Sequence, residues 1–198
     1  MKRYSNLISI IAITLMVVNC GPDFEIIEDL KYNDYQLLNI DSTRVEFPDL
    51  ISGDIGIVGY IFTNCPDICP LTTNNMRLVQ EQLKADNITG VQFVSISFDP
   101  DVDKPKVLKE FAQIRNLDLS NWDFLTGEKS TIDMLLKKVG VVAFVGDSTV
   151  FEDGSKSYYY THTDRIQLID QDGRIRKNYL GSAANIDEIV NDVRRLLD

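Results

Sequence analysis

Residues 55–70 read IGIVGYIFTNCPDICP, an apolar run that leads into two cysteines separated by three residues. The first eight residues are rich in β-branched and aromatic side chains, a pattern that predicts a buried strand. Residues 71–85 carry apolar side chains at helical spacing, and Pro70 suits the first helical position because no partner is needed there for a backbone N–H. We therefore expect a strand, a turn and a helix, with Cys65 in the turn and Cys69 at or near the helix N-cap.

The sequence after this unit predicts further strands and helices in alternation. Segments typical of strands cover 91–98, 122–125, 158–162, 165–170 and 175–179, the last two joined by a hairpin turn at 171–174. Segments typical of helices cover 104–115, 130–139 with Ser130 as its N-cap, and a last helix to Leu197 that opens with a capping box at 185–188. This order predicts an α/β fold, a thioredoxin-like sandwich with a mixed central sheet and a terminal β-hairpin plus helix.

The composition is that of an ordinary soluble domain. Of the 198 residues, 44% are hydrophobic and 25% are charged, which argues against a disordered or fibrous protein. The net charge of −10 makes the surface repel phosphate backbones, so we expect no nucleic-acid partner. The chain has a single histidine, which excludes a metal site built from several histidines.

The N-terminus has the features of an export signal. Lys2 and Arg3 precede an apolar segment at 7–18, which is shorter than the roughly 20 residues that a membrane span needs. The segment is followed by Cys20 in a context similar to bacterial lipoprotein signals, in which the cysteine carries the lipid. A plain secretory signal with an incidental cysteine is the alternative.

These features divide the chain into three parts. We expect residues 1–19 to be a lipoprotein-type signal peptide, residues 20–40 a membrane-proximal linker, and residues 41–198 the thioredoxin-like domain that carries the site. A lipid on Cys20 would anchor the exported protein to the membrane, facing the bacterial periplasm.

The two remaining cysteines, Cys65 and Cys69, form an even pair. In an oxidising compartment such a pair is normally a disulfide or a metal site. Both sulfurs lie near the positive end of a helix, which favours the thiolate. Two thiolates select Cu(I), zinc or an iron–sulfur cluster, and the lack of further cysteines in the domain excludes a four-cysteine site. A structural disulfide between the two is the alternative.

The only histidine, His162, follows Cys69 by 93 residues. In a thioredoxin-like sheet the loop before the terminal hairpin packs beside the cysteine turn, and thioredoxin-type enzymes place a cis-proline there. All six prolines of this chain precede residue 106, so that position is free for His162. Two thiolates and one imidazole suit Cu(I) as a trigonal centre, or Cu(II) if a further ligand completes the site.

Four blocks of sequence resemble the Sco/SenC family of copper-binding assembly factors for cytochrome oxidase. The family pattern T-x-C-P-D-x-C-P matches Thr63–Pro70, and S-x-D-P-x-x-D-x-P matches Ser97–Pro105. A late histidine matches His162, and the motif L-I-D-x-D-G matches Leu168–Gly173. The blocks keep the family's order and cover roughly residues 45–180.

The resemblance implies a copper metallochaperone with a thioredoxin-like fold and a membrane anchor. In the family the two cysteines and the histidine bind copper, which assigns Cys65, Cys69 and His162 as the ligands of one copper ion. The implied partners are the copper-receiving subunit of a respiratory cytochrome c oxidase and a copper donor or thiol reductant.

Other functions are compatible with the same residues. Cys65 and Cys69 alone would suffice for a thiol–disulfide oxidoreductase, in which one thiol attacks a disulfide and the other resolves the intermediate. Family members are credited with both roles. A thiol peroxidase, and a non-catalytic lipoprotein with a structural Cys65–Cys69 disulfide, are further alternatives.

Two other clusters invite a functional interpretation. Asp99, Asp101 and Asp103 suggest a hard-metal site, but we expect a solvated loop at the start of a helix, with Asp103 favoured by the helix N-terminus. The tyrosines at 158–160 are expected to lie on a strand surface next to the site, without binding a cofactor.

Overall fold

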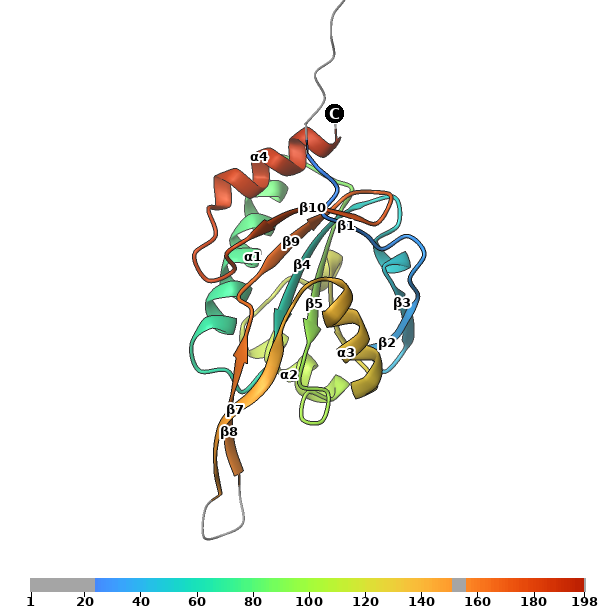
Figure 1. Cartoon of the computed structure of the whole chain (residues 1–198). Helices are drawn as coiled ribbons and strands as arrows, with labels where there is room; N and C mark the ends of the chain where they lie inside the picture. The colour runs from blue at the N-terminus through green and yellow to red at the C-terminus, as the bar shows by residue number, and fades with distance from the viewer. Residues whose placement is uncertain (1–23, 151–155, 198) are drawn as a thin grey trace, which may run out of the picture.

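The centre of the molecule is a mixed sheet built around the predicted strand that precedes the cysteines (Figure 1). The computed structural model describes residues 24–150 and 156–197. The strands are β1 (Glu28–Asp29), β2 (Tyr35–Asn39), β3 (Arg44–Phe47), β4 (Ile55–Ile61), β5 (Val91–Ser97), β6 (Trp122–Thr126), β7 (Ala143–Val150), β8 (Lys156–His162), β9 (Ile166–Ile169) and β10 (Arg174–Tyr179). The helices are α1 (Ile68–Ala85), α2 (Pro105–Ile114), α3 (Lys129–Lys138) and α4 (Ile186–Leu197), with single 3₁₀ turns at Asp49–Ile51 and Leu119–Asn121.

Eight of the strands form one sheet in the order β1-β10-β9-β4-β5-β6-β2-β3. Strands β4, β5 and β6 run parallel to one another, whereas β9 is antiparallel to β4 and β10 is antiparallel to β9. Parallel strands need crossover connections, which α1 and α2 supply. This is the thioredoxin-like α/β sandwich with a mixed sheet and a terminal hairpin plus helix that the sequence predicts.

Helices cover both faces of β4, which explains why all seven of its residues are buried. On one face Gly59 lets α1 approach closely, since a Cβ there would lie 2.5 Å from the sulfur of Met76. On the other face the Tyr60 hydroxyl donates to Gln167 Oε1 at 2.5 Å, and Gln167 Nε2 donates to the Val139 carbonyl just after α3. Helices α1 and α3 therefore lie on opposite faces, and α4 packs beside α1 (Figure 1).

The structure corrects the linker predicted for residues 20–40. Strands β1 and β2 belong to the main sheet, and Leu30 and Leu37 between and within them are buried in the core. The folded domain thus begins by Glu28. The sequence does not reveal β1 and β2 because both strands are short and lack the long apolar run of a central strand. The predicted signal peptide at 1–19 and Cys20 lie outside the described residues. No helix in the described part of the chain is long and apolar enough to cross a membrane.

Two predicted helix starts are wrong by one or more residues. Helix α1 begins at Ile68 after the N-cap Asp67. Cys69, predicted at or near the N-cap, lies two residues after it in the first turn, and Pro70 is the third helical residue instead of the first. The proline is tolerated there because the first four N–H groups of a helix have no partner within it. Helix α3 begins at Lys129, so Ser130 is inside the helix and not its N-cap.

Of the capping box predicted for α4, the hydrogen bond to the Asn185 side chain is present. The Asn185 side chain accepts a hydrogen bond from the Glu188 N–H at 3.2 Å, which satisfies one of the free donors at the helix start.

Strands β7 and β8 form a separate two-stranded hairpin that projects from the main body (Figure 1). Its register pairs Ala143 with His162, Val145 with Tyr160 and Ser148 with Tyr158. Strand β8 ends at His162, and after three intervening residues the chain enters β9 of the main sheet. The hairpin thus delivers its last residue to the edge of the body where β4 ends.

Candidate metal centre

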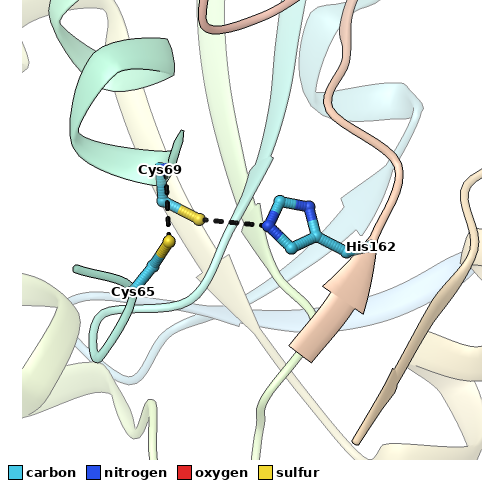
Figure 2. Close-up of side chains that lie close together, drawn as sticks. All are labelled: Cys65, Cys69 and His162. Atoms are coloured by element: carbon cyan, nitrogen blue, oxygen red, sulfur yellow. Dashed lines mark hydrogen bonds between the residues drawn. The ribbon is translucent and has the colours of Figure 1, made fainter. Parts of the chain in front are cut away.

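Two sulfurs and one imidazole nitrogen converge where β4, α1 and β8 meet (Figure 2). One ligand atom from each of Cys65, Cys69 and His162 lies within 4.8 Å of the other two. The Cys69 sulfur and His162 Nε2 are 3.9 Å apart. Metal–sulfur and metal–nitrogen bonds are about 2.0–2.3 Å long, so a single ion between the three atoms could reach all of them with small side-chain movements.

The cysteine side of the centre is built into the core. Cys69 is fully buried in the first turn of α1, and Cys65 in the preceding turn is 9% exposed. Both are free thiols. The Cys69 backbone N–H points at the Cys65 sulfur, at 3.3 Å. One sulfur of the pair therefore faces a helix N-terminus, as the sequence predicts.

The two thiols have opposite acidities. Hydrogen bonding from Cys69 is the main cause that lowers the pKa of Cys65 to about 3, with further help from His162 and from backbone N–H groups. The same interaction with Cys65, together with burial, raises the pKa of Cys69. Cys65 is therefore the thiol of the pair that ionises first, and the thiolate is the form that attacks disulfides and binds metals.

The histidine side is held by aromatic packing and one backbone contact. The His162 ring centre lies 4.8 Å from that of Phe98 and 6.3 Å from that of Phe62. Nδ1 lies 3.2 Å from the Thr163 carbonyl oxygen, which can only accept, so the proton of the neutral ring belongs on Nδ1. Nε2 is then left with a free lone pair toward the sulfurs, which is the arrangement a metal ligand needs.

Two effects act in opposite directions on the pKa of His162. Burial by itself would lower its pKa, but hydrogen bonding to Cys65 and to the Thr163 carbonyl, together with the negative charge of Cys65, raises the pKa above its usual value. The imidazole and the Cys65 thiolate therefore stabilise each other as a charged pair.

The prediction that Asp99, Asp101 and Asp103 lie in a solvated loop is wrong for Asp99 and Asp103, which are buried. Asp103 is fully buried and accepts hydrogen bonds from the Thr63 N–H at 3.0 Å, the Thr63 hydroxyl at 2.5 Å and the Ser97 hydroxyl at 2.6 Å. Burial raises its pKa, against the effect of these hydrogen bonds. Asp103 thus fixes the residue two places before Cys65, a role that the spacing of acidic residues does not reveal.

Asp99 is also buried, at 3% exposure, and it accepts hydrogen bonds from the Tyr158 and Tyr160 hydroxyls. Asp101 between them is exposed. The predicted strand surface is therefore correct for Tyr159, whereas its two neighbours face inward. Strand alternation from His162 places residues 158 and 160 on its own face, a signal present in the sequence. Within the described residues, the only group of three His, Cys, Asp or Glu side chains spaced to hold a metal is Cys65, Cys69 and His162.

Fold and site together define a class, a thioredoxin-like protein with a mixed thiolate and imidazole centre suited to a soft metal. Within that class the chain belongs to the SCO1/SenC family, whose model matches residues 27–198. A SCO1 protein homolog from Bacillus subtilis is 33% identical over 185 residues, which is 92% of this chain and 91% of that protein. The family resemblance inferred from the sequence motifs is confirmed.

Solved structures show the same fold. A SCO1/SenC family lipoprotein from Bacillus anthracis superposes with a TM-score of 0.71 at 32% identity, covering 91% of this chain and 99% of that one. ScoI of Bradyrhizobium japonicum with copper bound gives 0.69 at 25% identity, over 82% and 97%. BsSco, described as having a disulfide switch and as a member of the Sco family of cytochrome c oxidase assembly proteins, gives 0.68 at 32% identity, over 89% and 96%.

Proposed function

We propose that this protein is a copper metallochaperone in which Cys65, Cys69 and His162 hold one copper ion. The observation that carries the proposal is the meeting of these three side chains, the last of them 93 residues from the second. Two sulfurs and one nitrogen are a soft donor set that favours copper over hard cations. A relative of the same fold is known with copper bound.

The placement of the ligands supports transfer of the ion as well as binding. His162 is half-buried at the end of the projecting hairpin, and Cys65 is slightly exposed, whereas Cys69 is fully buried. A ligand from another protein would therefore reach the ion from the side of Cys65 and His162. Exchange of these ligands one at a time would release the ion without leaving it free in solution.

The proposed recipient is the copper-receiving subunit of a respiratory cytochrome c oxidase, with a copper donor or thiol reductant acting before transfer. Support comes from the family of BsSco, which is named for assembly of that oxidase. We also propose that residues 1–19 are removed and that Cys20 carries a lipid, which would hold the domain at the membrane facing the periplasm. A B. anthracis relative is a lipoprotein.

A second function, thiol–disulfide exchange, is favoured by the low pKa of Cys65. The Cys65 thiolate would attack a disulfide of a partner, forming a mixed disulfide and releasing one partner thiolate. Cys69 would then lose its proton and attack the Cys65 sulfur, which releases the second partner thiolate. The protein is oxidised to a Cys65–Cys69 disulfide by two electrons, and the partner disulfide is reduced to two thiols.

The test is a Cu(I) titration of the reduced protein from Phe24 onward, a form that lacks Cys20 and so has no third thiol. We expect one ion per chain. Cys65→Ser and His162→Ala should each weaken binding by at least about tenfold, since changes to groups behind the ligands already cost about 10–100-fold. A stoichiometry well below one, or binding unaffected by His162→Ala, would contradict the copper proposal. Reduction of disulfide substrates at the wild-type rate by copper-free His162→Ala would favour thiol exchange.

A further inference from the structure

We propose that Asp99 is a positioning residue for His162, and that it acts through the hydroxyls of Tyr158 and Tyr160. The inference rests on the proposed copper function, since it concerns how the histidine ligand is held. We call the three residues Asp99, Tyr158 and Tyr160 the hairpin anchor. The anchor joins the projecting β7–β8 hairpin to the turn that follows β5.

The anchor geometry follows from strand alternation. In β8 the side chains of Tyr158, Tyr160 and His162 lie on one face, and that face is turned toward the body of the protein. The Tyr158 hydroxyl donates to Asp99 Oδ2 at 2.5 Å, and the Tyr160 hydroxyl donates to Asp99 Oδ1 at 3.4 Å. Tyr159, on the opposite face, is 55% exposed.

The Asp99 carboxylate needs the two tyrosine hydroxyls as hydrogen-bond donors. It is almost completely buried, and among the described residues no lysine or arginine forms an ion pair with it. A buried carboxylate without donors is strongly unfavourable, and hydrogen bonds to a charged acceptor are the stronger class. A tyrosine hydroxyl keeps its proton at physiological pH, so both hydroxyls act as donors to Asp99.

The anchor sets the position of the imidazole along the hairpin. The Tyr160 ring packs against Phe62 and Phe98, with ring centres 5.2 and 5.1 Å away, and His162 packs on the same Phe98. Aromatic pairs accept a range of centroid distances, whereas the 2.5 Å hydrogen bond from Tyr158, supported by the longer one from Tyr160, is short and directional. The hydroxyls therefore fix the position of β8 relative to the body of the protein. This position brings His162 to the sulfurs.

One short segment links both halves of the centre. The turn from Ser97 to Asp103 holds the cysteine side, because Asp103 accepts hydrogen bonds from Thr63. The same turn holds the histidine side through Asp99. The Ser97 hydroxyl ties the two together, since it accepts from the Asp99 N–H at 3.0 Å and donates to Asp103. The distance between sulfurs and imidazole is thus set by this turn and not by the hairpin alone.

The first test uses the reduced protein from Phe24 onward and the variant Tyr158→Phe/Tyr160→Phe, with Tyr159→Phe as the matched control. Each change removes only a hydroxyl. We expect Cu(I) affinity about tenfold lower in the double variant, within the 10–100-fold range for groups that orient a ligand, and unchanged in the control. In a His162→Ala background the double change should have less than about a twofold effect, because the anchor acts through His162.

The second test needs no copper. His162 is the only histidine, so its imidazole protons give one assignable set of NMR signals in an untagged protein. At a fixed pH, packing on Phe98 shifts these signals from those of an unstructured histidine. We expect Tyr158→Phe/Tyr160→Phe to move them toward the unstructured values, with Tyr159→Phe leaving them in place. Asp99→Asn should give an intermediate shift, because an amide oxygen still accepts.

The outcomes separate the anchor from the copper function. Unchanged imidazole signals in the double variant would overturn the anchor, as would an equal loss of affinity in the presence and absence of His162. If His162→Ala leaves the copper affinity of the wild type unaltered, the copper proposal fails instead. The NMR comparison then still decides whether the hydroxyls position the ring.

Discussion

The two halves of the centre are supported in different ways. The cysteines lie at the junction of β4 and α1, where the strand is covered on both faces and Cys69 is fully buried. His162 lies at the end of a two-stranded hairpin outside the main sheet, with Phe144 and Tyr159 more than half exposed on its outer face. The cysteine half belongs to the core, and the histidine half is brought to it.

This difference indicates that the cysteine half and the histidine half of the centre have different structural roles. An isolated two-stranded hairpin has little stability of its own, so its position depends on what it packs against. The core can therefore hold the thiols in a fixed geometry, and in the proposed ligand exchange the imidazole side would be the part that moves. Three further experiments, together with the copper titration and the anchor variants above, test whether the halves are independent to this degree.

The largest expected difference is between the pH dependence of Cys65 alkylation and that of an ordinary thiol. Because the pKa of Cys65 is about 3, lowering the pH from 8 to 5 should leave it ionised, and its alkylation rate by iodoacetamide should change less than about threefold. An ordinary thiol with a pKa near 8.5 would slow about tenfold per pH unit, roughly 1,000-fold in all. The rate in reduced protein is followed by mass spectrometry.

The matched control for that measurement is His162→Ala. Hydrogen bonding from Cys69 is the main cause of the low pKa of Cys65, and His162 contributes less, so the variant should keep a flat profile between pH 5 and 8. A rate that falls tenfold per unit in the variant alone would show that the cysteine half depends on the hairpin.

A smaller effect is expected from Asp103→Ala, which removes the acceptor of three hydrogen bonds beside the cysteine turn. We expect the free energy of unfolding to fall by about 2–4 kcal/mol, since hydrogen bonds to a charged group are worth about 1.5–3 kcal/mol each and relaxation recovers a part. Urea unfolding at pH 7 measures this. Asp101→Ala, on the exposed aspartate of the same loop, should change it by less than about 0.5 kcal/mol. Equal losses in both variants would refute the role of Asp103.

The smallest effect is expected on the outer face of the hairpin. Phe144 is 54% exposed, so Phe144→Ser should change the free energy of unfolding by less than about 0.5 kcal/mol and leave copper affinity unaltered. Urea unfolding and Cu(I) titration check both. A large loss of stability would mean that this face of the hairpin is packed against the protein and that the contrast between the halves is overstated.

Sequence patterns predicted the main elements well where the pattern was strong. The strand before the cysteines ends one residue earlier than predicted, and the second apolar strand also ends one residue earlier. The patterns failed at β1, which lies at one edge of the sheet, and at β2, which lies between β6 and β3, because both strands are short. They also misplaced the start of α1, since a proline at the third helical position is as acceptable as one at the first.

The buried aspartates show a different kind of limit. Asp99 and Asp103 look like surface residues because carboxylates are rarely buried without a partner. Apart from Ser97, which is near Asp103 in sequence, their partners are Thr63, Tyr158 and Tyr160, which lie 40 to 61 residues away. No local pattern can report a hydrogen bond between residues that only the fold brings together.

The amino-acid sequence by itself determined the class of chemistry. Two cysteines in a strand–turn–helix unit and a single histidine were enough to nominate all three candidate ligands, because donor type and helix position are local properties. Only the tertiary structure decided how they meet. The distance between Cys69 and His162 depends on a hairpin docked by Asp99 and on a cysteine turn held by Asp103, and such long-range contacts exist only once the sheet has formed.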